Sequence, residues 1–152
     1  MKLRLTSLIG LMLVLSGSDV RVHGADGNGG TYYIQLVRGT VDDKPPAAEA
    51  RPIGPKVARC FQPVFKWGYY WEMNRREIIL PAGRVTRIQL NPERAVELDL
   101  TEPGKRKVKT FEGTKPVCSV VNMAGDRMSI VGGDRTANSS WFIVVRRDMP
   151  TN

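Results

Sequence analysis

Short segments in which apolar and polar residues alternate, separated by Gly and Pro about every ten residues, most constrain the fold of this chain. Alternation with a period of two places the apolar side chains on one face of a β-strand. No segment shows a helical period over ten or more residues. About eight such segments predict an all-β fold, either an antiparallel β-sandwich of immunoglobulin-like architecture or a small barrel.

Three segments allow more specific predictions. The clearest hairpin is "AVELDLTEPGKRKVKTFEG", because Pro103 and Gly104 suit the two central positions of a type II turn. In "SSWFIVVRRD", five successive apolar residues from Trp141 to Val145 predict a strand that is buried on both faces or lies centrally in its sheet. The Gly-rich "VGGDRTANSS" favours a hairpin loop, because it lacks the Lys-Ser/Thr ending of a phosphate-binding loop.

Residues 65–80 form an aromatic segment, "FKWGYYWEMNRREIIL". Their period of two predicts one core-facing row, which consists of Phe65, Trp67, Tyr69, Trp71 and Met73. The phase changes after Met73, so a bulge or turn is expected around "NRR". In the alternative, aromatic side chains of this segment stay exposed and stack on sugars or bases, and Tyr70 is then a binding residue.

The N-terminus, "MKLRLTSLIGLMLVLSGS", has two basic residues before an apolar run, which is the layout of a secretory signal peptide. Residues 1–24 are predicted to be this signal peptide, with cleavage after Ser18 or Gly24. The alternative is an uncleaved anchor, although the run is shorter than the ~20 residues of a membrane span. Because Ser18 stands where a lipoprotein would need cysteine, we expect a secreted or periplasmic protein without a membrane span after processing.

The rest of the chain is predicted to be a single β domain, residues 31–149, preceded by a flexible segment at 25–30. Residues 40–63 form a proline-rich arm that is predicted to be extended, because four prolines forbid a continuous helix. Arms of this length are often functional, and a plain surface connection is the alternative.

Cleavage after Gly24 would remove 24 of the 152 residues and leave 128, and the formal net charge would fall from +8 to +6. It would also remove His23, the only histidine. Without histidine, no Ser-His-Asp or Cys-His nucleophile pair can form. Two cysteines alone do not complete a tetrahedral zinc site. We therefore predict no catalytic residue, no metal site and no cofactor.

Cys60 and Cys118 would both lie in the exported part of the chain, where disulfides persist. An even number of cysteines in a small exported domain predicts one bridge between them. Two free, buried thiols are the alternative, because pairing geometry cannot be read from a sequence.

Four basic residues cluster near the tip of the predicted hairpin: Lys105, Arg106, Lys107 and Lys109. Clustered cations attract anionic glycans and lipid head groups, so these residues are candidate binding residues. In the alternative, they only solvate a strand edge and block edge-to-edge pairing.

These observations favour an exported, non-catalytic β-sandwich protein that binds a protein partner or an anionic envelope component. Intracellular nucleic acid is not an expected partner of an exported protein. The alternative is a histidine-independent, glycan-acting enzyme that uses carboxylates, for which the candidates are Glu72, Glu77, Glu97 and Asp99.

The "RGT" end of the first strand, the proline-rich arm and the "FKWGYYWE" segment resemble small uncharacterised exported bacterial all-β proteins. The resemblance covers most of residues 31–147. It implies export and a β fold, and it implies no activity and no functional residue.

Overall fold

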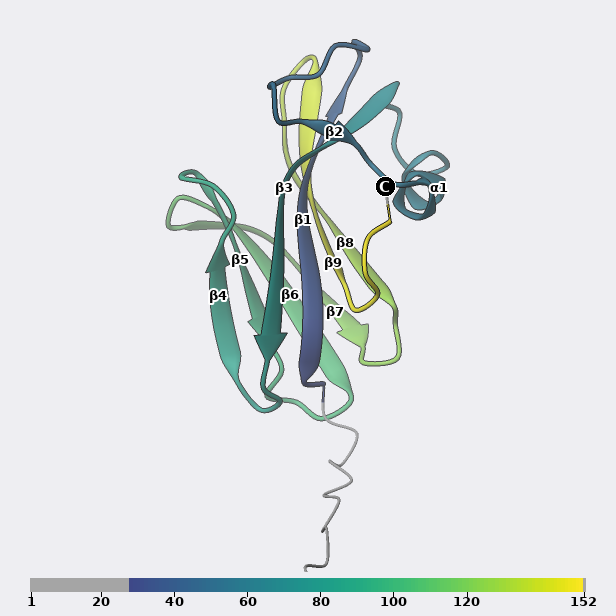
Figure 1. Ribbon diagram of the computed structural model, residues 1–152. Helices are drawn as coiled ribbons and strands as arrows, with labels where there is room; N and C mark the ends of the chain where they lie inside the picture. The colour runs from purple at the N-terminus through teal and green to yellow at the C-terminus, as the bar shows by residue number, and fades with distance from the viewer. Residues whose placement is uncertain (1–27, 152) are drawn as a thin grey trace, which may run out of the picture.

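The computed structural model describes residues 28–151, so the predicted signal peptide lies outside the described residues. In the part it describes, nine strands form two antiparallel sheets, which confirms the all-β sandwich (Figure 1). One sheet has the strand order β2-β3-β1-β9-β8, and the other has the order β4-β5-β6-β7.

The five-stranded sheet consists of β1 (Gly30–Thr40), β2 (Arg51–Pro52), β3 (Tyr69–Leu80), β8 (Met128–Arg135) and β9 (Ser139–Arg146). The four-stranded sheet consists of β4 (Val85–Gln89), β5 (Arg94–Asp99), β6 (Lys105–Glu112) and β7 (Lys115–Met123). One helix, α1 (Pro55–Phe61), lies between β2 and β3 in the chain.

The main core fills the space between the two sheets. The five-stranded sheet contributes Ile34, Leu36, Ile143 and Val145, and the four-stranded sheet contributes Val96, Leu98 and Val108. Strand β9 lies between β1 and β8 in its sheet, and its apolar side chains are buried on both faces. Phe142 and Val144 belong to a second cluster on the outer face of the five-stranded sheet, which confirms the prediction of a central, doubly buried strand.

Helix α1 covers this outer face, and the proline-rich arm is therefore not extended throughout. Pro55 occupies the first turn, where the backbone N–H has no acceptor within the helix and its absence is tolerated. The helix is only seven residues long and includes Pro55. Val57 and Phe61 of α1 are fully buried in the second cluster. The prediction of an extended arm was wrong at this point, because a short helix needs no long helical period when its apolar side is buried against a sheet.

Strand β3 differs from the predicted single core-facing row. Trp71 is buried and is the cross-strand partner of Arg38, whereas Tyr70 is buried on the outer face beneath α1, and Tyr69 is exposed. The alternation predicts one buried and one solvated face of β3. Helix α1 adds a third layer, which buries Tyr70 on the second face as well. A bulge occurs where Met73 has no partner on β1, directly before the "NRR" triplet around which it was predicted.

The hairpin between β5 and β6 has the predicted turn. The N–H of Lys105 donates to the carbonyl oxygen of Glu102 at 3.1 Å, which closes a four-residue turn. Gly104, at the third position of this turn, has a φ of 76°, as a type II turn requires.

The predicted disulfide is absent, because both cysteines are free thiols. Cys60 is exposed on α1, which covers the outer face of the five-stranded sheet. Cys118 lies on β7 and packs against the core between the sheets. The five-stranded sheet therefore stands between the two sulfur atoms, and the prediction of a bridge was wrong.

The N-terminal part of the described chain is fixed by side-chain hydrogen bonds. Asn28 is only 1% exposed, and its amide donates to the carbonyl oxygens of Glu102 and Lys105. The predicted flexible segment 25–30 is thus ordered in the portion that the structure describes, because Asn28 anchors it to the β5–β6 turn.

Candidate binding site

Arg106 is not a surface residue, contrary to the prediction. Its side chain is completely buried between the sheets, where the guanidinium donates to Ser129 Oγ at 2.8 Å and 3.1 Å. It also donates to the carbonyl oxygen of Asp126 at 3.1 Å. Burial lowers the pKa of this guanidinium. Arg106 shares the alternation phase of Val108, a core residue, and this phase was the sequence signal that could have placed it inside.

The three lysines of the predicted cluster lie on the outer face of the four-stranded sheet, together with carboxylates. Lys105 forms an ion pair with Glu102 at 2.5 Å, and Lys107 lies 4.0 Å from Asp99. Lys109 is the cross-strand partner of Glu97. Each of the three lysines therefore has an acidic neighbour on this face.

Tyr70 was predicted as an exposed binding residue, and the structure corrects this. Only 8% of it is exposed, and its ring contacts Phe61 at a centroid distance of 4.9 Å. Burial raises the pKa of its hydroxyl. The hydroxyl donates to the carbonyl oxygen of Phe65 at 3.0 Å, so Tyr70 holds the loop between α1 and β3 in place.

This loop forms one wall of a groove on the outer face of the five-stranded sheet, which we call the aromatic–cationic groove. Its cavity volume is ≈ 470 Å³. The lining residues come from the loop, from the edge strand β8 and from its neighbour β9: Val64, Phe65, Lys66, Trp67, Gly132, Arg135, Ser140 and Phe142. The groove thus combines a wall of three aromatic rings with two cations.

Trp67 is positioned by its contact with β1. A Cβ atom on Gly39 would stand 2.7 Å from two atoms of the indole, so only glycine permits this close approach. The ring is half-buried and borders the groove. Phe65 is held beside it by a tilted ring contact with Phe142 at a centroid distance of 4.5 Å. The aromatic wall is therefore pre-formed.

The charged side chains that the structure describes in the groove are both cationic. Lys66 and Arg135 are exposed at its rim, and Ser140 supplies a hydroxyl on its floor. None of the lining residues whose side chains the structure describes is acidic. This distinguishes the groove from the lysine-bearing face of the other sheet, where carboxylates stand beside the cations.

Sequence reasoning identified half of this groove. The aromatic segment was recognised as a possible stacking surface, but Arg135 and Ser140 were assigned to a plain hairpin loop. Strand register brings them together, since Arg135 pairs with Ser140, and Ser140 pairs with Gly39 beneath Trp67. No local sequence signal reports this juxtaposition.

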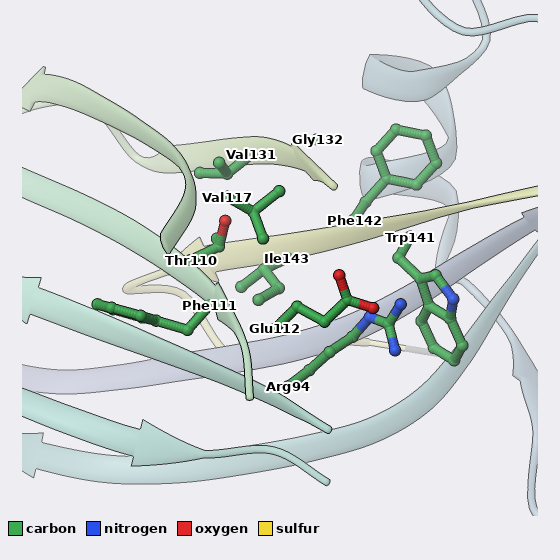
Figure 2. A pocket seen from close by; sticks show the side chains of 10 residues that line it. All are labelled: Arg94, Thr110, Phe111, Glu112, Val117, Val131, Gly132, Trp141, Phe142 and Ile143. Atoms are coloured by element: carbon green, nitrogen blue, oxygen red, sulfur yellow. The ribbon is translucent and has the colours of Figure 1, made fainter. Parts of the chain in front are cut away.

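A second, narrower crevice opens between the two sheets at the same end of β9. Aliphatic and aromatic side chains line most of it, and its cavity volume is only ≈ 20 Å³. Figure 2 shows Arg94 and Glu112 side by side at one end of it, next to Trp141. This space suits about one water molecule and no larger ligand.

The carboxylates considered for catalysis do not converge. Glu97 and Asp99 lie on the four-stranded sheet, whereas Glu72 and Glu77 lie on β3. Glu72 is buried and accepts hydrogen bonds from Gln35 and from Arg75, the latter at 2.9 Å. It borders a hollow of ≈ 470 Å³ whose other residues are Glu49, Arg51, Met73, Asn74 and Arg75. Two guanidinium groups thus accompany the two carboxylates of this hollow.

Residues 28–151 contain neither a cluster of metal-ligating side chains nor a helix that could span a membrane. No group of three or more His, Cys, Asp or Glu side chains in this range is placed to hold a metal ion. None of the helices described there is long and apolar enough to cross a membrane.

Comparisons of the chain with protein-family models, with curated proteins and with solved structures found no match.

Proposed function

We propose that this chain is an exported, non-catalytic β-sandwich protein that binds an anionic glycan in the aromatic–cationic groove. The observation that supports this most directly is the lining of the groove: Phe65, Trp67 and Phe142 form an aromatic wall, and Lys66 and Arg135 supply charge without a described carboxylate. Aromatic walls with a few polar groups are typical of sites that bind small molecules and chains.

The sequence left a protein partner, an anionic glycan and a lipid head group open as ligands, and the shape of the groove favours the glycan over the lipid. A lipid surface is flat and would meet an exposed face, whereas this site is concave and has its aromatic side chains on one wall. A sugar ring presents an apolar face that can stack on an indole and hydroxyls that can bond to Ser140. The two cations would then pair with acidic substituents of the glycan.

The enzymatic alternative has weaker support. Glu49 and Glu72 border one hollow, as a pair of carboxylates would need to. Glu72, however, is engaged by Gln35 and Arg75, which hold it as an ion-pair partner. Of the two carboxylates in this hollow, Glu72 is therefore bound to structural partners, and Glu49 lies on a loop.

The experiment measures binding of the protein to immobilised heparin, a polyanionic glycan probe, at low and at physiological salt. The double variant K66Q/R135Q is expected to lower the affinity at least tenfold, or ~1.4 kcal/mol, and W67A is expected to lower it by a similar factor. The matched control K107Q/K109Q removes two lysines from the other sheet and should change the affinity less than twofold. All binding should weaken as salt rises, because exposed charges are screened over ~8 Å.

Other outcomes would overturn the proposal in distinct ways. Loss of binding in K107Q/K109Q alone would assign the site to the lysine face. Binding to anionic lipid vesicles, with none to heparin, would assign a lipid head group as the ligand. Release of reducing sugar from an acidic glycan, abolished by E49Q, would favour the enzyme.

A further inference from the structure

The opposite face of the sheet, behind the aromatic–cationic groove, carries a second aromatic and cationic row. Strand register places Arg38 of β1 between Trp71 of β3 and Trp141 of β9. The guanidinium of Arg38 lies 5.2 Å from the ring centroid of Trp141. All three tryptophans of the chain therefore gather at one end of the five-stranded sheet, with Trp67 on one face and the other two on the reverse face.

Arg38 lacks a described acidic partner. The one hydrogen bond that its side chain makes within residues 28–151 is a donation to Ser139 Oγ at 3.3 Å. Its Nε–H is buried and has no acceptor in the same range. Arg94, which lies 4.2 Å from the same Trp141 ring, differs because it pairs with Glu93 at 3.0 Å. Arg38 is thus a half-buried cation that forms no ion pair with a described carboxylate.

The groove and Arg38 are separated by the thickness of one sheet. Ser139 and Ser140 are successive residues of β9 and point to opposite faces, as side chains of a strand do. Ser140 lies in the groove, and Ser139 accepts the hydrogen bond from Arg38. Figure 1 shows that this end of the five-stranded sheet extends beyond the four-stranded sheet, so the backbone of the other sheet does not cover the edge formed by the β8–β9 hairpin.

We infer that the glycan is a polyanion longer than the groove, and that it continues over this edge and places a second anionic group beside Arg38. This inference rests on the proposed function of the groove. The anionic group would accept the guanidinium N–H donors that no described residue uses.

The experiment compares heparin-derived tetrasaccharide and dodecasaccharide by isothermal titration at low salt. Wild-type protein should bind the longer chain at least tenfold more tightly. R38Q should lose that advantage and bind the tetrasaccharide with unchanged affinity. R84Q, which removes an exposed arginine at a turn outside both sites, is the matched control and should keep the advantage.

A second measurement uses the unchanged protein, so that the inference remains testable even if R38Q does not fold. The ¹H–¹⁵N resonance of the Arg38 Nε–H should shift when the dodecasaccharide is added and stay in place with the tetrasaccharide. An unshifted resonance, or an R38Q variant that binds both chains as the wild type does, would overturn the second subsite and leave the groove intact. If W67A and K66Q/R135Q bind both chains normally, the proposed function itself fails.

Discussion

At the scale of single residues, Arg106 has the environment most at odds with its residue type. It is completely buried, and one of its terminal nitrogens, Nη1, has no hydrogen-bond partner within the described chain. The other two nitrogens of the guanidinium donate hydrogen bonds to Ser129 Oγ and to the carbonyl oxygen of Asp126 in the turn between β7 and β8. Its long side chain also fills the space beside Tyr32. Arg106 is therefore a packing residue that carries a charge.

The variant R106Q should lower the free energy of unfolding by ~3 kcal/mol, because it removes buried packing and leaves polar groups without their donor. Urea unfolding followed by fluorescence measures this change. K107Q, one residue away on the exposed face, is the control and should stay within ~0.5 kcal/mol of the wild type. Equal stability of the two variants would contradict the inward orientation of Arg106.

Asp148 links α1 to the end of β9 through bonds to Lys56 and to the buried Arg146. The hydrogen bond from Arg146 holds the pKa of this carboxyl well below its usual range. A lowered pKa stabilises the fold above the pKa of the unfolded chain, ~3.9. That stabilisation is lost as the pH falls through the lower, folded value.

D148N should therefore destabilise the protein by roughly 2 kcal/mol at neutral pH, less than the ~3–5 kcal/mol of a fully buried pair because the Asp148 side chain is 35% exposed. The difference between D148N and the wild type should shrink as the pH is lowered from 5 towards 2. Unfolding in urea across this range tests the sign, with the exposed D43N as the control. A difference that grows on acidification would reject the assignment.

At the scale of elements, α1 depends on tertiary contact. A helix of seven residues is too short to be stable alone. Its N-cap residue, Gly54, has no side chain that could accept a hydrogen bond from the first turn. Phe61, fully buried, contacts Tyr70 and Phe142 at 4.9 Å and 5.0 Å between ring centroids. These contacts hold both the helix and the loop that carries Trp67.

F61A should cost ~3–5 kcal/mol and should also weaken heparin binding, because the wall of the groove would lose its support. Hydrogen exchange in residues 55–68 should accelerate more than in the four-stranded sheet. C60S, an exposed change on the same helix, should leave both properties unaltered. Uniform acceleration across both sheets would indicate global destabilisation without a local role for α1.

At the scale of the whole molecule, the arrangement of the layers keeps both cysteines in the thiol form. The five-stranded sheet separates Cys60 from Cys118, so neither thiol can reach the other in the folded protein. We expect a reducing agent to leave the melting temperature unchanged. In native protein, a thiol reagent should modify the exposed Cys60 faster than the half-buried Cys118. An intact mass two hydrogens below that of the dithiol form would contradict this arrangement.

The sequence by itself determined the local features: the strand type, the type II turn at Pro103-Gly104, and the central position of Trp141–Val145. Each follows from a period of two, from the allowed φ of glycine, or from a continuous apolar run, and these effects act over a few residues. The tertiary structure decided that Tyr70 is buried, that Arg135 faces Trp67, and that the cysteines stay apart. These outcomes depend on which layers cover each sheet, and a strand pattern cannot report whether its second face meets water or a helix.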